Sequence, residues 1–173
     1  MAYCTECGTE LKLRFLDREG MIPYCETCGA YRFPGFSVAI STIVYSPDAQ
    51  KILLIKQYGR DRNILVAGYV NKGEAAEHAL QREVKEEMGL HVTECCFNMS
   101  EYFEKSNTLM LNFASIVDSE DLSGMTDEVD DAAWYTPAQA REAITHDSLA
   151  EKFLLAWLDK RETYDRVFDT CRF

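Results

Sequence analysis

Three glutamates crowd into five positions of the stretch REVKEEMGL, at Glu83, Glu86 and Glu87. If this stretch is helical, spacings of three and four residues place all three side chains on one face. Arg82 can pair with Glu86 four residues along, whereas Glu83 and Glu87 have no lysine or arginine at either spacing. Each like-charge contact costs about 0.2–0.5 kcal/mol in an isolated helix. The pattern therefore indicates either a solvated acidic face or carboxylates placed to bind a divalent cation such as Mg²⁺.

Four of the seven cysteines form a second candidate metal site, in the pairs CTEC and CETC. Four thiolates at this spacing can close a tetrahedral shell around Zn²⁺ and so stabilise a segment too small to be held by burial. The alternative is two disulfides in a secreted domain, which the absence of a signal peptide and the three further cysteines disfavour. The predicted zinc ligands are Cys4, Cys7, Cys25 and Cys28. The other cysteines, for which no binding role is predicted, are Cys95, Cys96 and Cys171.

Length and composition are those of one globular domain with room for a small appendage. The chain has 173 residues, 47% of them hydrophobic. No apolar run approaches the roughly 18–20 residues of a membrane span, so we expect a cytoplasmic protein that does not enter a membrane. The formal net charge of −11 argues against broad binding of nucleic acid, because such binding relies on lysine and arginine. A small anionic substrate would need help from a bound cation.

Hydrophobic patterning predicts the elements that could position these residues. Residues 1–33 are predicted to form a zinc ribbon with short strands over LKLRFLD and GMIPYC, and RFPGF then interrupts any regular element. Residues 34–173 are predicted to form an α/β domain. Its last two helices begin with residues suited to a first turn and a cap, Pro137 and Ser148. The strands are expected at 36–45, 51–59, 64–70, 91–103, 107–117 and 131–137, and the helices at 74–89, 137–145 and 148–162.

The glutamates belong to a longer pattern. Glu74 follows Gly68 after five residues, and Arg82 follows Glu74 after seven, in the segment that ends at Leu90. These residues fit G-x5-E-x7-R-E-U-x-E-E-x-G-U, where U is aliphatic, at every specified position, and the chain therefore resembles the Nudix hydrolases. The resemblance implies an α/β/α sandwich with a mixed sheet. It also implies a hydrolase, dependent on Mg²⁺ or Mn²⁺, that cleaves a nucleoside diphosphate linked to another group.

The resemblance also implies roles for individual residues. Arg82 and Glu74 would brace the loop and helix, while clustered ions would neutralise the diphosphate and lower the pKa of an attacking water. Downstream, DEVDDAAWY resembles an acidic segment of the family in which Glu128 supplies a further metal ligand or proton acceptor, the alternative being a solvated loop acid. The implied catalytic set is Arg82, Glu83, Glu86, Glu87 and Glu128, and its four glutamates are the implied magnesium ligands.

A cysteine ribbon directly ahead of a Nudix domain resembles the NADH pyrophosphatase branch of the family. The substrate signature of that branch, SQPWPFPxS, corresponds to SEYFEKSNT at residues 100–108, which contains no proline. Because prolines pre-set the conformation of a loop, we expect a pocket of different shape. Tyr69 matches an aromatic residue that stacks on a base of the substrate, and Phe103, in place of the signature tryptophan, could be its partner. Packing in the core or exposure at the surface is the alternative for both.

These features favour hydrolysis of an NAD(H)- or ADP-ribose-like nucleotide by a protein with a structural Zn²⁺, and the branch implies a possible homodimer. Removal of an NAD cap from RNA is a variant that the acidic charge disfavours. The alternative class is a zinc-ribbon module that binds nucleic acid or protein beside a nucleotide-sensing Nudix domain. Arg60 and Arg62, on a predicted loop, could contact phosphates or serve only at the surface. His78 is expected to be exposed on the predicted helix.

Overall fold

The computed structural model describes residues 2–163, with side chains described as far as Lys160. Cys171 lies outside the described residues. The chain forms two compact units, Met1–Phe36 and Ser37–Phe173. Among the helices of the described chain, none is long and apolar enough to cross a membrane.

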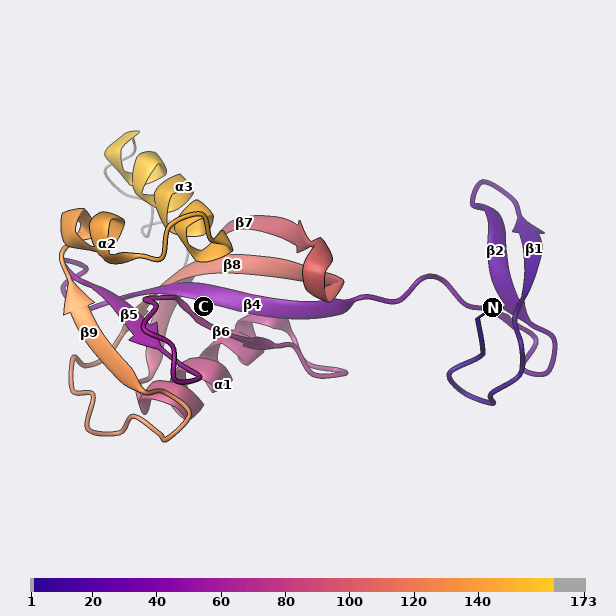
Figure 1. Ribbon diagram of the computed structural model, residues 1–173, viewed down its shortest axis with the longest axis horizontal. Coiled ribbons are helices and arrows are strands. Elements are labelled where there is room, and N and C mark those ends of the chain that lie inside the picture. Colours follow the sequence, from indigo (N-terminus) through magenta and orange to yellow (C-terminus); the bar gives the residue numbers. More distant parts are fainter. Residues whose placement is uncertain (1, 164–173) are drawn as a thin grey trace. The chain divides into compact units, whose positions relative to one another are not determined.

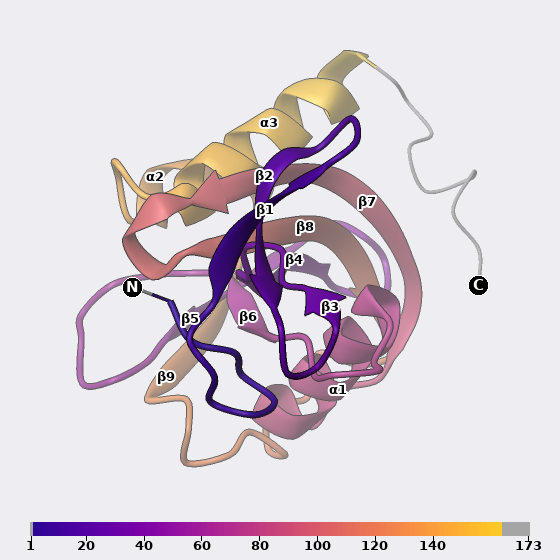
Figure 2. The same cartoon turned by 90° about the vertical axis from the view of Figure 1, so that its right-hand side faces the viewer.

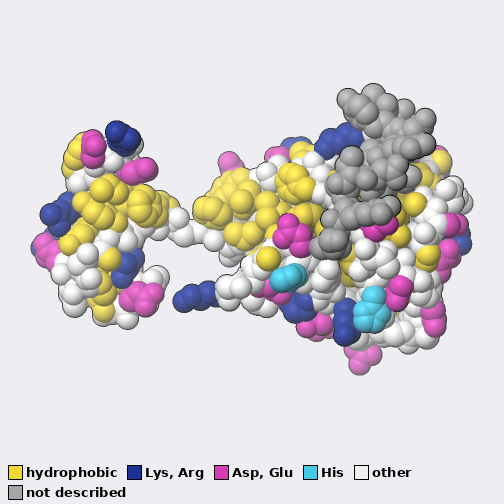
Figure 3. All heavy atoms as spheres, turned by 180° about the vertical axis from the view of Figure 1, so that it is seen from behind, with side chains coloured by type: hydrophobic (Ala, Val, Ile, Leu, Met, Phe, Trp, Pro, Cys, Tyr) yellow, Lys and Arg dark blue, Asp and Glu magenta, His cyan; other side chains and the backbone are white. Residues whose placement is uncertain are grey.

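The smaller unit is a three-stranded antiparallel sheet in the order β1 (Lys12–Leu16), β2 (Gly20–Cys25) and β3 (Ala30–Tyr31). Several of its large apolar side chains lie in water, and Leu13, Phe15 and Met21 are 64%, 66% and 57% exposed. Figure 3 shows apolar side chains gathered on the surface of this unit. Because so little apolar surface is buried, the unit needs a further source of stability, such as a bound metal ion.

The larger unit is built on a six-stranded sheet in the order β7–β8–β4–β5–β9, with β6 paired to β4 (Figure 1). The β4–β8 pair is parallel and the other pairs are antiparallel, so the predicted mixed sheet is confirmed. The strands are β4 (Ser37–Tyr45), β5 (Ile52–Lys56), β6 (Val66–Tyr69), β7 (Val92–Phe103), β8 (Thr108–Val117) and β9 (Asp131–Tyr135).

Helices cover both faces of this sheet, which confirms the predicted α/β/α sandwich. Figures 1 and 2 show α1 (Ala76–Met88) on one face and α3 (Leu149–Thr163) on the other, where α2 (Pro137–Ala143) also packs. α2 begins at Pro137 behind a capping box formed by Thr136 and Gln139, and Ser148 caps α3 by accepting the N–H of Glu151 at 3.1 Å. Both of these helix starts agree with the prediction. The apolar residues of α1 that enter the core are Ala79, Leu80, Val84 and Met88.

Two loops differ from the sequence-based expectation. The strand predicted over 51–59 is too long, because β5 ends at Lys56 and the chain turns at Tyr58 and Gly59, whose φ angles are +62° and +63°. A short 3₁₀ helix, Glu104–Ser106, joins β7 to β8 within the segment that contains no proline. Both loops border the site described next.

Candidate active site

Arg82, on α1, is the centre of an ion-pair network. Its Nε and Nη2 donate to the two carboxylate oxygens of Glu74 at 2.8 and 3.0 Å, and Nη2 also donates to the carbonyl oxygen of Tyr69 at 3.0 Å. Its Nη1 donates to Glu83 at 2.7 Å and to Glu86 at 3.0 Å. Glu83 has no basic residue three or four positions away, and its partner in the structure is instead its direct neighbour, Arg82. One guanidinium carries five N–H donors, which is enough to serve three carboxylates.

This network fixes the loop between β6 and α1. Hydrogen bonds from Arg82 and from the backbone N–H of Asn71 lower the pKa of Glu74 to about 2. Hydrogen bonds to Glu74 and Glu83 raise the pKa of Arg82 above its usual range. Both groups therefore remain charged at any physiological pH, and the loop is held to α1 by a charged, two-pronged contact.

Glu83 lies directly against the backbone of Gly68 on β6. A Cβ atom at Gly68 would stand 1.9 Å from Cδ of Glu83 and 2.0 and 2.4 Å from its carboxylate oxygens. No side chain fits there, so a glycine is needed for the carboxylate of Glu83 to occupy its position.

Glu87 is the one site glutamate that is almost fully buried, at 4% exposure. Its Oε1 accepts a hydrogen bond from Nε2 of Gln57 at 2.8 Å, whereas its Oε2 is buried without a hydrogen-bond partner. Burial raises the pKa of Glu87 to about 7, and the negative charges of Glu83, Glu128 and Glu86 act in the same direction. An unsatisfied buried carboxylate oxygen is costly, and a divalent cation is a ligand that would satisfy it. The residues present therefore fit a metal ion at this position.

Glu128 is brought to the same place by a loop attached to the end of α1. The backbone N–H of Thr126 donates to the carbonyl oxygen of Glu87 at 3.0 Å. Gly89 ends the helix with a φ of +70°, and a Cβ atom there would stand 2.8 Å from the backbone of Gly124. This close approach of two glycines lets the loop that carries Glu128 lie against the helix.

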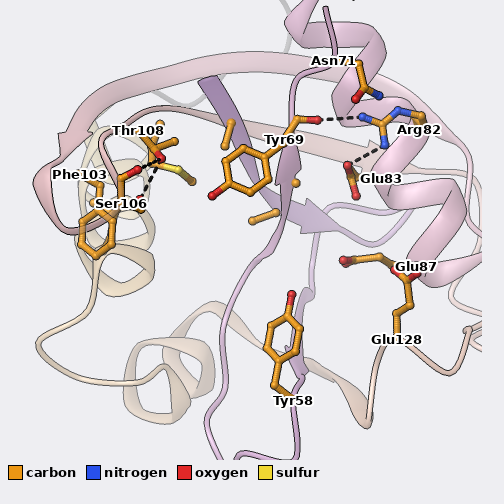
Figure 4. Close-up of a pocket in the computed structure, with 15 residues that line it drawn as sticks. Tyr58, Tyr69, Asn71, Arg82, Glu83, Glu87, Phe103, Ser106, Thr108 and Glu128 are labelled. Carbon is orange, nitrogen blue, oxygen red and sulfur yellow. Dashed lines mark hydrogen bonds and ion pairs between the residues drawn. The ribbon is translucent and has the colours of Figure 1, made fainter. Parts of the chain in front are cut away.

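A cleft of about 670 Å³ joins these residues to the predicted aromatic positions (Figure 4). Glu86 is not part of its lining and instead borders a neighbouring groove with His78, which is exposed, and Lys85. Glu86 nevertheless lies beside Glu83, because Nη1 of Arg82 bonds both carboxylates, at 3.0 and 2.7 Å. The predicted site residues that line the cleft are Tyr69, Arg82, Glu83, Glu87, Phe103 and Glu128.

The four predicted zinc ligands lie together in the smaller unit, with their sulfur atoms within 4.8 Å of one another. The Sγ atoms of Cys7 and Cys25 are 3.5 Å apart and those of Cys4 and Cys28 are 4.0 Å apart. Tetrahedral zinc with Zn–S bonds of about 2.3 Å places sulfurs about 3.8 Å apart, so the geometry fits. Within residues 2–163, no other group of candidate ligands is this compact, and all six described cysteines are free of disulfides.

Hydrogen bonds lower the pKa of the Cys4 and Cys7 thiols, whereas hydrogen bonds with Cys7 and Cys25 raise the pKa of the Cys28 thiol to about 12. The backbone N–H of Glu6 and the guanidinium of Arg32, whose Nε lies 3.3 Å from Sγ of Cys4, lower the pKa of that thiol to about 6. The backbone N–H of Cys28 also donates to Sγ of Cys25 at 3.4 Å. A thiolate is the form that binds a metal ion, so the contacts of Cys4 prepare that sulfur for one.

A model of the NUDIX domain family matches residues 35–157. The chain belongs to the NUDIX family. It is 25% identical over 159 residues to the NAD-capped RNA hydrolase NudC of Pseudomonas aeruginosa, covering 92% of this chain and 56% of that protein. It is 30% identical over 168 residues to the NAD-capped RNA hydrolase ndx-9 of Caenorhabditis elegans, covering 92% of this chain and 44% of that protein. The chain therefore spans about half the length of the curated relatives it matches.

A solved structure has the same fold. The crystal structure of a NUDIX hydrolase from Nitrosomonas europaea has a TM-score of 0.72 with this chain, at 18% identity, and the match covers 95% of this chain and 94% of that one.

Gln57 and Tyr58 are among the residues of this NUDIX site that were not predicted from the sequence. Gln57 is 6% exposed and bonds the buried Glu87, yet it lies outside the sequence pattern. Tyr58, which follows it, lines the cleft. The available signal was a polar residue directly after KILLIK, in which only the four central residues are apolar. A polar side chain buried beside such a strand must find a hydrogen-bond partner, although the sequence does not say which.

Proposed function

We propose that this NUDIX protein is a metal-dependent pyrophosphohydrolase that cleaves the diphosphate linkage of an NAD(H)- or ADP-ribose-like nucleotide. The proposal rests on Glu87, whose buried carboxylate leaves one oxygen unsatisfied in a cleft that Glu83 and Glu128 also line. A cation at this oxygen would relieve the cost of burial and would attract a polyanionic substrate to an acidic protein.

The four glutamates Glu83, Glu86, Glu87 and Glu128 would hold Mg²⁺ or Mn²⁺. When bound, such ions neutralise the charge of a diphosphate and lower the pKa of a water molecule that attacks phosphorus. Because Mg²⁺ keeps several of its waters, the carboxylates need not all touch it directly.

The remaining residues of the chain would orient these ligands. Gln57 holds one oxygen of Glu87 and leaves the other for the ion. Arg82 holds Glu83 and Glu86 in fixed positions and is itself held by Glu74, so we assign it a positioning role in the catalytic set. The carboxylates are therefore arranged before the substrate arrives, which is the condition for efficient electrostatic catalysis.

Tyr69 and Phe103 support a nucleotide substrate. Both line the cleft that contains the carboxylates, and Tyr69 is 58% exposed. Aromatic rings that remain in water beside a polar site are suited to stack on a base. A diphosphate at the glutamates with a base at these rings is the arrangement that a dinucleotide or ADP-ribose would adopt.

Removal of an NAD cap from RNA is a second candidate, favoured by the names of the matched relatives in Pseudomonas aeruginosa and Caenorhabditis elegans. The bond to be cleaved is the same as in free NAD. The net charge of −11 disfavours contact with a long RNA chain, so we propose the free nucleotide as the better substrate.

The sequence predicts a zinc ribbon at residues 1–33, ahead of a hydrolase domain at 34–173. We propose that this ribbon binds a structural Zn²⁺ through Cys4, Cys7, Cys25 and Cys28. A closed shell of four cysteines has no open position for chemistry. Its expected contribution is therefore to the stability of the smaller unit.

The proposal can be tested with a substrate panel and product identification. NADH, NAD, ADP-ribose, FAD, diadenosine compounds, nucleoside triphosphates and NAD-capped RNA are each incubated with Mg²⁺ or Mn²⁺. We expect NAD(H) to yield AMP and nicotinamide mononucleotide. Cleavage of none of these compounds would refute the enzyme, and salt-dependent binding of nucleic acid without cleavage would support the alternative of a binding module.

A further inference from the structure

The turn at residues 57–60 has a tyrosine, Tyr58, at a position where turns of its type favour other residues. Tyr58 and Gly59 have φ angles of +62° and +63°, and the N–H of Arg60 donates to the carbonyl oxygen of Gln57 at 3.3 Å. Two central residues with positive φ are typical of a type I′ turn, which favours asparagine, aspartate or glycine at both positions. A bulky residue with this backbone is an outlier that costs stability.

Burial does not compensate for this strain. The side chain of Tyr58 is 80% exposed, more than any other large apolar side chain of the described residues. Its ring therefore contributes little to the hydrophobic core. A residue that strains the backbone and buries almost nothing is a candidate for a functional role.

The turn is fixed to the acidic site on both sides of Tyr58. The N–H of Gly59 donates to a carboxylate oxygen of Asp130 at 2.7 Å, and the N–H of Asp130 donates to the carbonyl oxygen of Lys56 at 2.8 Å. On the other side, the side chain of Gln57 holds Glu87. The position of Tyr58 is thus set by contacts with the elements that carry the glutamates.

Tyr58 faces the cleft from the side opposite Tyr69. Figure 4 shows its ring across the cleft from that of Tyr69, with its hydroxyl group directed inward, and both residues belong to the cleft lining. The space between two exposed aromatic rings is suited to a planar group, on which an aromatic side chain can stack.

We propose that Tyr58 is a substrate-contacting residue, which forms the wall of the cleft facing Tyr69 and stacks on a planar ring of the bound nucleotide. This inference rests on the proposed function, because it requires a nucleotide in the cleft. It adds an aromatic contact that lies outside the Nudix box and outside the segment 100–108.

The test is the change Tyr58→Asn, measured by the thermal midpoint Tm and by the Kd for AMP and for nicotinamide mononucleotide in calorimetry. Asparagine suits the turn, so Tm should rise by about 2–4 °C. Loss of the ring should raise the Kd for the nucleotide that stacks there by about five- to a hundredfold. Tyr58→Phe, which keeps the ring, should bind as the unaltered protein does.

A matched control is Ala49→Gly, which relieves a residue with a φ of +55° at the other end of β5, outside the cleft lining. Its Kd values should not change. Binding by Tyr58→Asn equal to that of the unaltered protein would overturn the inference, as would failure of the unaltered protein to bind either nucleotide. If binding weakens as expected but no diphosphate is cleaved by the unaltered protein, the inference stands and the proposed hydrolase fails.

Discussion

Glu87 should couple magnesium binding to pH. Because burial raises its pKa to about 7, much of the carboxyl is protonated below pH 7 in the metal-free protein. An ion that binds the carboxylate must displace this proton, so the affinity for Mg²⁺ should fall below pH 7 by up to about tenfold per pH unit. Calorimetric titration with Mg²⁺ between pH 5.5 and 8.5 measures this dependence, and a flat profile would contradict it.

The same carboxyl should affect stability when magnesium is absent. Its folded-state pKa of about 7 is above the usual value of 4.5, so the cost of ionising Glu87 is absent below pH 4.5 and complete above pH 7. Without added Mg²⁺, this residue should therefore lower Tm as pH rises from 5 to 8. Glu87→Gln should remove this part of the fall in Tm between pH 5 and 8, whereas the control Glu77→Gln, at an exposed residue, should keep it.

Gly68 is the residue whose enlargement should harm the site most selectively. In Gly68→Ala the new methyl group would collide with the carboxylate of Glu83, which must move away. With Glu83 as the proposed metal ligand, its displacement by about 1 Å should lower kcat by about a hundredfold. Gly35→Ala is the control, because its methyl group would meet no atom within 4 Å. Steady-state kinetics on both variants test this prediction. Equal kcat values would show that the position of Glu83 is unimportant.

At the level of elements, the end of α1 and the loop that carries Glu128 should depend on the contact between Gly89 and Gly124. Gly89→Ala would add both backbone strain and a collision at 2.8 Å. Gly73→Ala, with a φ of +86° and open space around it, would add strain alone. We expect a lower Tm for both, and an additional loss of kcat only for Gly89→Ala, because only that change displaces Glu128. Equal effects on kcat would contradict the proposed role of this contact.

The local elements were largely predictable. The apolar residues of α1 recur at helical spacing, and Gly89 is a residue that commonly ends a helix. The helix was therefore predicted to within two residues at each end. The strand predicted over 51–59 was too long, because no local sequence signal indicates that Tyr58 has a positive φ. Contacts that determine such a turn, as between Gly59 and Asp130, join residues 71 positions apart.

At the level of the whole molecule, the smaller unit should depend on the zinc ion that we propose for its four cysteines. Replacing Cys7 and Cys28 together by serine should abolish zinc binding, measured by elemental analysis, and should make residues 1–36 sensitive to protease. The cleft residues all belong to the larger unit, whose core is separate. A double variant that stays resistant to protease throughout would show that Zn²⁺ does not stabilise this unit.

The candidate site was predictable where its residues are close in sequence. The Nudix box from Gly68 to Leu90 and the two cysteine pairs each have a characteristic spacing in the sequence, and both groups were identified from that spacing. The bond between Gln57 and Glu87 spans 30 positions and depends on how β5 packs beside α1. The bidentate contact of Arg82 with Glu74 and the position of Glu86 beside the neighbouring groove depend likewise on side-chain geometry, which spacing does not define.

The most direct test of a metal-dependent hydrolase is the joint change of Glu83 and Glu87 to glutamine, assayed for NADH cleavage and for Mg²⁺ affinity. Both measurements are made without chelator, so that the zinc ion proposed at the cysteines would not be removed. We predict a fall of at least about a hundredfold in kcat and a clear loss of Mg²⁺ affinity, in a protein whose Tm is not reduced. Unchanged turnover together with unchanged Mg²⁺ affinity would contradict the assignment of these carboxylates as metal ligands.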